Sequence, residues 1–147
     1  MKNLLLILCF LPMWALAQEE DQSKYMVGAV PEVNGKVVFS QEINAPNLSK
    51  DQIFDAILAW ANTRFKTDKG NWGMVAYSNK EEGQIACYGN EYIVFADKTF
   101  SLDRAKINYR MNFTCTPGKC NVEVTNITYL YPEDNRERLA AEEWITD

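Results

Sequence analysis

Residues 49–66, SKDQIFDAILAWANTRFK, form the clearest helix pattern in the sequence. Ser49 and Gln52 have the spacing of a capping box, in which each side chain accepts a hydrogen bond from the other residue's backbone N–H. Apolar residues at helical spacing form one stripe, with Trp60 at its edge: Ile53, Phe54, Ile57, Leu58, Ala61 and Phe65. Because the remaining pattern is mostly strand-like, we expect this stripe to pack on a sheet. The polar face has few cations, which argues against a membrane-surface helix.

A strand and a hairpin are predicted after the helix. Apolar residues alternate with polar ones between residues 104 and 115, the pattern of a strand with one buried face. Cys115 and Cys120 flank the turn sequence Thr-Pro-Gly-Lys, which pairs them across a hairpin and places Phe113 opposite Val122. Farther along the return strand the apolar phase shifts by one residue, which predicts a β-bulge near residues 125–126 or a strand whose far end is covered on its other side.

Shorter elements complete the pattern. Asn34-Gly35, between the apolar runs 25–33 and 36–43, predicts a hairpin with an irregular first arm. Short strands are expected at residues 73–79, 84–89 and 91–96, with turns at 80–83 and at Gly89-Asn90. A second, short helix is predicted at residues 135–145, capped by Asp134. Helices on one face of an antiparallel sheet make an α+β fold.

The first residues, MKNLLLILCFLPMWALA, have the pattern of a secretory signal peptide. We expect cleavage after Ala17, a disordered leader over residues 18–24, and a single domain over residues 25–147. The product is expected to be exported, to the periplasm or outside the cell, without stable membrane insertion after cleavage, because the apolar run is too short for a span.

The composition excludes several chemistries. The chain has no histidine, so Ser-His-Asp and Cys-His catalysis and imidazole metal sites are absent. It shows no phosphate-binding loop, and we expect no cofactor. Its net charge of −5 argues against nucleic-acid binding. Adjacent carboxylates occur at Glu81-Glu82, Glu133-Asp134 and Glu142-Glu143, but neighbours on a turn or helix end are usually solvated charges and not a catalytic pair.

Three cysteines lie beyond the signal peptide. Cys115 and Cys120 are disulfide candidates, because an exported protein keeps disulfides and the hairpin brings the two together; the alternative is two buried thiols. Cys87 has no evident partner, and it is either a small core residue or a reactive thiol.

Aromatic residues on or beside the expected strands are the remaining signal. Core packing explains such residues in most proteins. The functional interpretation is a groove between sheet and helix, or an exposed patch that binds an unknown protein or a small apolar ligand. The candidates for this surface are Trp72, Tyr88, Tyr92, Tyr129 and Tyr131. We therefore expect a non-catalytic binding or protein-interaction module of the cell envelope, the alternative being a hydrolase that uses carboxylates or a cysteine.

Three segments together resemble a known family: GAVPEVNGKVVFSQEI at residues 28–43, the capped helix IFDAILAWANTRF at 53–65, and AAEEWITD at 140–147. They are similar to a family of small exported Bacteroidota proteins, a domain of unknown function with a TATA-binding-protein-like (TBP-like) fold. The resemblance implies a curved antiparallel sheet with helices on one side. It implies no activity, and the name of the fold implies no DNA binding, because fold does not determine function.

Overall fold

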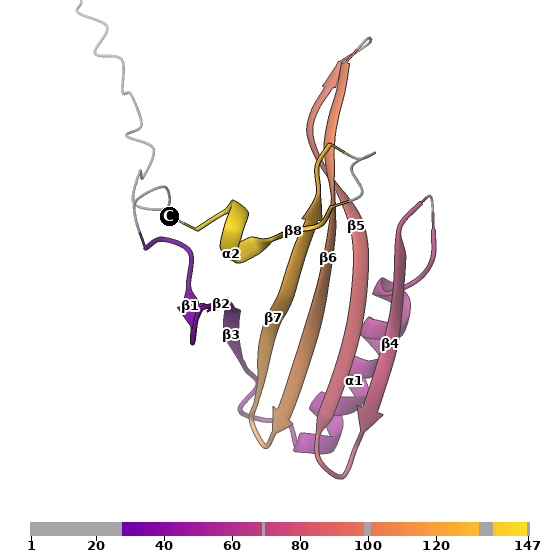
Figure 1. The fold of residues 1–147 in the computed structure, drawn as a ribbon. Helices are drawn as coiled ribbons and strands as arrows, with labels where there is room; N and C mark the ends of the chain where they lie inside the picture. The colour runs from indigo at the N-terminus through magenta and orange to yellow at the C-terminus, as the bar shows by residue number, and fades with distance from the viewer. Residues whose placement is uncertain (1–27, 69, 99–100, 133–136, 147) are drawn as a thin grey trace, which may run out of the picture.

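The computed structural model describes residues 28–68, 70–98, 101–132 and 137–146 (Figure 1). The expected signal peptide and leader, residues 1–24, lie outside these ranges. Along the chain the elements are β1 (Glu32–Val33), β2 (Lys36–Val37), β3 (Phe39–Asn44), α1 (Lys50–Arg64), β4 (Trp72–Asn79), β5 (Gln84–Lys98), β6 (Ser101–Thr116), β7 (Lys119–Leu130), β8 (Leu139–Ala140) and α2 (Ala141–Trp144). Long, twisted strands form an antiparallel sheet in the order β3-β7-β6-β5-β4, and β8 pairs with β7 beyond the end of β3.

Helix α1 confirms the pattern from which it was predicted. The Gln52 N–H donates to Ser49 Oγ at 3.3 Å, and the Ser49 N–H donates to Gln52 Oε1 at 2.9 Å, so both halves of the capping box are present. Its apolar stripe packs on one face of the sheet, where it buries Ile53, Phe54 and Ala61. Burying this stripe fixes α1 across β4, β5 and β6 (Figure 1).

The register of β6 and β7 also follows the predicted pattern. Cys115 pairs with Cys120 and Phe113 pairs with Val122. The ladder shifts between Asn108 and Arg110, opposite a residue with positive φ, Asn126 at 53°. This is the predicted bulge, and it returns Ile127 and Tyr129 to the face that α1 covers.

The predicted turn at Gly89-Asn90 is wrong. β5 runs without a break from Gln84 to Lys98 and pairs with β6 on both sides of Gly89. The glycine serves packing: a Cβ at position 89 would overlap the ring of Tyr109 on β6. A glycine inside a strand often marks such a close approach, and the sequence pattern alone does not distinguish it from a turn.

The predicted second helix is too long. Helix α2 covers only Ala141–Trp144, and Leu139–Ala140 form β8. Pairing with Tyr129 and Thr128 of β7 satisfies backbone groups that a helix would otherwise have to satisfy. The predicted cap, Asp134, lies outside the described ranges.

Two buried clusters lie on the same face of the sheet. One lies beneath α1 and includes Ile85, Cys87 and Phe113. The other lies beneath α2 and the β1–β2 hairpin and includes Val37 and Ile127. Tyr109 packs against both clusters, which makes the core continuous on this face. None of the described helices packs on the opposite face, which we call the open face.

Candidate functional site

A groove of about 650 Å³ lies beside α1 on the covered face. Its polar lining residues are Ser40 and Gln41, and eight apolar residues form the rest: Phe39, Ile43, Ile57, Trp60, Met111, Phe113, Val122 and Val124. Phe39, Ile43 and Trp60 remain 41%, 44% and 45% exposed. We call this the apolar groove.

Element dimensions explain why this groove exists. Five strands about 4.8 Å apart span roughly 20 Å, whereas one helix with its side chains is about 10 Å across. Helix α1 lies over the β4–β6 side and therefore leaves the β7–β3 side uncovered. β3 is an edge strand whose six residues are all exposed. Apolar side chains on that side consequently face the groove instead of a second helix.

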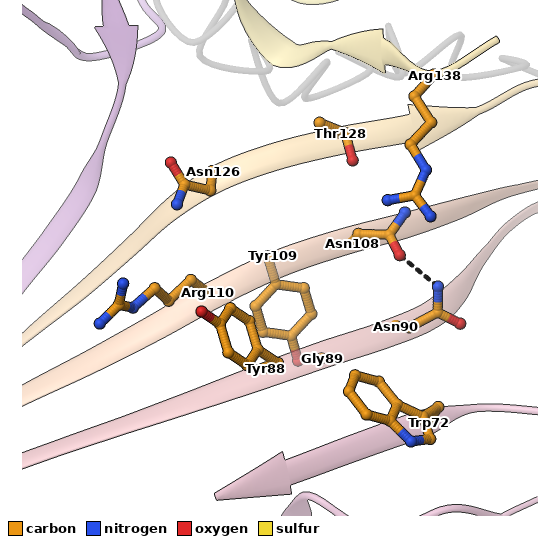
Figure 2. Close-up of a pocket in the computed structure, with 10 residues that line it drawn as sticks. All are labelled: Trp72, Tyr88, Gly89, Asn90, Asn108, Tyr109, Arg110, Asn126, Thr128 and Arg138. Atoms are coloured by element: carbon orange, nitrogen blue, oxygen red, sulfur yellow. Dashed lines mark hydrogen bonds between the residues drawn. The ribbon is translucent and has the colours of Figure 1, made fainter. Parts of the chain in front are cut away.

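A second concavity, of about 620 Å³, lies on the open face (Figure 2). Four strands and the residue before β8 supply its lining: Trp72, Tyr88, Gly89, Asn90, Asn108, Tyr109, Arg110, Asn126, Thr128 and Arg138. None of these ten residues is a carboxylate. We call it the open-face hollow, and it shares no lining residue with the apolar groove.

One buried donor of the hollow has no hydrogen-bond partner among the described residues. Asn90 Nδ2 donates to Asn108 Oδ1 across β5 and β6 (Figure 2). Asn108 Nδ2 is buried and has no acceptor among the described residues. Arg110 Nε donates to Asn112 Oδ1 at 2.8 Å, which holds its guanidinium 5.8 Å from the Tyr88 ring. The hollow thus combines positioned amides with an aromatic–cation pair.

The five aromatic residues proposed from the sequence separate into two groups. Trp72 and Tyr88 line the hollow, and Tyr92 lies farther along β5, with Arg104 4.0 Å from its ring. Tyr129 and Tyr131 lie on the covered face, where their rings are 4.6 Å and 5.6 Å from that of Trp144. The bulge in β7 accounts for this separation, because it sets the face on which Tyr129 and Tyr131 lie.

Sequence reasoning missed the polar half of the hollow. The alternating pattern assigns Asn108 and Arg110 only to the polar phase of a strand. The available signal is the charge of that phase, because Arg104, Lys106 and Arg110 occupy alternate positions of the strand, with Asn108 between the last two, and so share one face. Arg138 had no such signal, since it reaches the hollow from far along the chain.

The cysteines do not form the expected bond. Cys115 and Cys120 oppose each other as predicted, but they are free thiols with sulfur atoms 3.7 Å apart, beyond the roughly 2.05 Å of a disulfide. Both are buried in the cluster beneath α1, where they pack as small apolar side chains. Burial raises the pKa of Cys115 to about 12 and that of Cys87 to about 11. None of these values favours a thiolate nucleophile near neutral pH.

The partly buried carboxylate of Glu91 is engaged in structural contacts. Burial opposes its ionisation, but hydrogen bonds from Arg64, at 2.7 Å, and from the Tyr109 hydroxyl outweigh that effect and lower the pKa of Glu91. The trio ties the end of α1 to β5 and β6. Within the described ranges there is no group of His, Cys, Asp and Glu that could hold a metal ion. No helix in those ranges is long and apolar enough to cross a membrane.

Comparison with known proteins places this architecture in a family. A family model described as a domain of unknown function (DUF4468) with TBP-like fold matches residues 39–130. The crystal structure of a DUF4468 family protein from Bacteroides ovatus is 44% identical, with a TM-score of 0.77, over 88% of this chain and 74% of that one. A TBP-like protein from Parabacteroides distasonis is 32% identical, with a TM-score of 0.65, over 77% of this chain and 70% of that one. No curated protein matches. The capped helix, the bulged hairpin and the antiparallel sheet are thus features of a chain that belongs to the DUF4468 family, a domain of unknown function with a TBP-like fold.

Proposed function

We propose that this protein is an exported, non-catalytic binding module of the cell envelope that takes a small apolar ligand in the apolar groove. The observation that carries the proposal is the groove itself, in which eight of ten lining residues are apolar and three large side chains stay more than 40% exposed. An apolar surface of this kind, left open on a folded domain, marks a binding site. The volume of about 650 Å³ lies within the range of small-molecule pockets.

The non-catalytic part of the proposal draws on the titratable groups. Burial holds the thiols in their neutral form, with the pKa of Cys87 raised to about 11. Glu91 is held ionised by Arg64 and Tyr109 and is not poised to exchange a proton near neutral pH. The groove lining contains no titratable side chain that could serve as acid or base. These features support binding rather than a hydrolase built on a carboxylate or a cysteine.

The edge strand β3 favours a second candidate, a protein partner. β3 pairs with β7 on one side, and no described strand pairs with its other side. Such an edge can accept a strand from another chain. A partner paired there could place apolar side chains in the adjoining groove. The two candidates are distinguished by whether a small molecule or a second polypeptide co-purifies with the native protein.

A fluorescent probe tests the binding site directly. We expect the uncharged probe N-phenyl-1-naphthylamine to bind the protein saturably. Ile43→Glu places a carboxylate in the groove, and we expect it to weaken binding by at least about tenfold, because the charge would have to be desolvated. Val33→Glu is the matched control, since Val33 is 54% exposed on β1 and does not line the groove. Equal probe affinity in the two variants would contradict the proposed site.

Native mass spectrometry then separates the two candidates. Protein recovered from the envelope of its own cells should carry an adduct of small-molecule mass, and Ile43→Glu should lose it. A second polypeptide that accompanies the wild type but not Ile43→Glu would favour a protein partner and contradict the small apolar ligand. An unaccompanied protein that also fails to bind the probe would refute both candidates.

A further inference from the structure

The open-face hollow differs from the apolar groove in position and in chemistry. It lies on the opposite face of the sheet, and it is lined by amides, a hydroxyl, aromatic rings and two arginines. The apolar ligand proposed above would leave these polar groups without partners. The hollow therefore needs its own explanation, and that explanation does not depend on the groove.

The charge of the hollow is opposite to that of the whole chain. The chain carries a net charge of −5, yet the described lining of the hollow includes Arg110 and Arg138 and no carboxylate. Farther along the same face, Arg104 and Lys106 lie 4.0 and 5.1 Å from the ring of Tyr92. On the same face, Glu123 pairs with Asn112 and lines a neighbouring depression, which shares Arg110 with the hollow. This local excess of positive charge selects an anionic ligand.

The hydrogen-bond donors define where the anion would lie. Figure 2 shows the Asn108 amide nitrogen on the side of its residue that faces the Arg138 guanidinium. Both groups are donors, and Asn108 Nδ2 has no acceptor within the described part of the chain. A buried donor without a protein acceptor destabilises the folded state unless a water molecule or a ligand supplies an acceptor. A carboxylate accepts from both donors at once.

The remaining lining groups select the rest of the ligand. Trp72 is 46% exposed and Tyr88 is 40% exposed, so both rings offer apolar faces to a ligand. Asn90, Asn126 and Thr128 offer both donors and acceptors, which suit hydroxyl groups. The cavity of about 620 Å³ accommodates one or two sugar rings.

We propose that the open-face hollow binds an acidic sugar, a pyranose that carries a carboxylate. The carboxylate lies between Arg138 and Asn108, the apolar face of the ring lies against Trp72, and the hydroxyls bond the amides and Thr128. Single-stranded nucleic acid also combines anions with flat rings. The acidic sugar fits better, because the net negative charge of the chain repels a polyanion and the amides match hydroxyls.

Titration calorimetry on the full chain tests this proposal with a matched pair of ligands. Glucuronate and glucose differ only at C6, which is a carboxylate in glucuronate and a hydroxymethyl group in glucose. We expect glucuronate to bind at least about tenfold more tightly, the effect of one charge-assisted hydrogen bond. Equal affinity for the two sugars, or no binding of glucuronate, overturns the proposal. Binding of oligothymidylate that glucuronate does not displace overturns it in favour of nucleic acid.

Variants locate the site. Arg138→Ala and Asn108→Asp should each weaken glucuronate binding by at least about tenfold, the first by removing a donor and the second by placing a competing carboxylate beside Arg138. Lys66→Ala is the control, because it removes one cation from the exposed segment after α1. If Lys66→Ala weakens binding as much as Arg138→Ala does, only the overall charge matters and the assigned site is wrong. The comparison of the two sugars on the wild type stands even if a variant fails to fold.

Discussion

The ring of Tyr109 on β6 occupies the space that a side chain at position 89 of β5 would fill. The hydroxyl of Tyr109 donates a hydrogen bond to the Glu91 carboxylate, and Tyr109 packs against both buried clusters. One tyrosine thus joins the two halves of the core and explains why a glycine lies in the middle of a long strand.

Replacement of Gly89 by alanine tests this close approach. We expect Gly89→Ala to lower the free energy of unfolding by about 1–3 kcal/mol, because the added methyl overpacks the site. Urea denaturation measures the loss. In combination with Tyr109→Leu, which removes the obstructing ring atoms, Gly89→Ala should cost less than it does alone. Strictly additive effects would show that the two residues do not compete for space.

The capping box of α1 gives a second stability prediction. Ser49→Ala removes the oxygen that accepts from the Gln52 N–H, and we expect a loss of about 1 kcal/mol. Ser78→Ala, on the exposed part of β4, is the matched control and should change stability by less than about 0.5 kcal/mol. Thermal unfolding measures the melting temperatures of the two variants. Equal melting temperatures would show that the Ser49 cap does not stabilise the fold.

Acid stability tests the trio of Arg64, Glu91 and Tyr109. The folded-state pKa of Glu91 lies below 4.5, the ordinary value of a glutamate, so its contribution to stability is present above pH 4.5 and is lost as the pH falls through the folded pKa. Because Arg64 is 44% exposed, solvent screens the pair, and we expect Glu91→Gln to cost only about 1 kcal/mol at pH 7. Between pH 7 and pH 3, the free energy of unfolding should fall less steeply with decreasing pH for Glu91→Gln than for the wild type. Parallel curves would argue against the trio.

Thiol labelling tests the state of the cysteines. Burial raises the pKa of Cys87 to about 11 and that of Cys115 to about 12, so iodoacetamide should modify neither in the native protein at pH 8. In denaturant, peptide mapping should find Cys87, Cys115 and Cys120 all alkylated without prior reduction, because all three are free thiols. Alkylation of Cys87 alone would mean that the hairpin cysteines are bonded after all.

Local signals in the sequence predicted much of the fold. The Ser49–Gln52 spacing, the alternation before Cys115 and the phase shift near Asn126 are each decided by residues close in sequence, and the structure confirms all three. The turn predicted at Gly89 is wrong, because a close approach between strands favours glycine as a turn does, and the local pattern does not distinguish the two. The predicted C-terminal helix is too long, because the pairing of Leu139 with Tyr129 is a tertiary contact that helical periodicity does not encode.

The candidate sites were less accessible from the sequence. The sequence identifies the five candidate aromatics by residue type alone, because apolar residues between 84 and 96 occur in both phases of the strand pattern and do not assign its faces. Only the register of β4 against β5, with Trp72 opposite Asn90, places Trp72 and Tyr88 on one side. Arg138 lines the same hollow only because the chain folds back beside β7, which no local sequence pattern predicts. The groove depends on the width of α1 relative to the sheet, which no short pattern contains.

Two tryptophans provide the most direct test of the proposed binding function. Trp60 borders the apolar groove and is 45% exposed, whereas Trp72 lines the hollow on the opposite face and is 46% exposed. Titration of ¹⁵N-labelled protein with N-phenyl-1-naphthylamine, followed through indole N–H signals assigned by Trp→Phe substitution, compares them within one sample. The account predicts that the Trp60 signal shifts and saturates while the Trp72 signal stays in place. A shift of Trp72 alone, equal shifts of both, or no shift of either would contradict it.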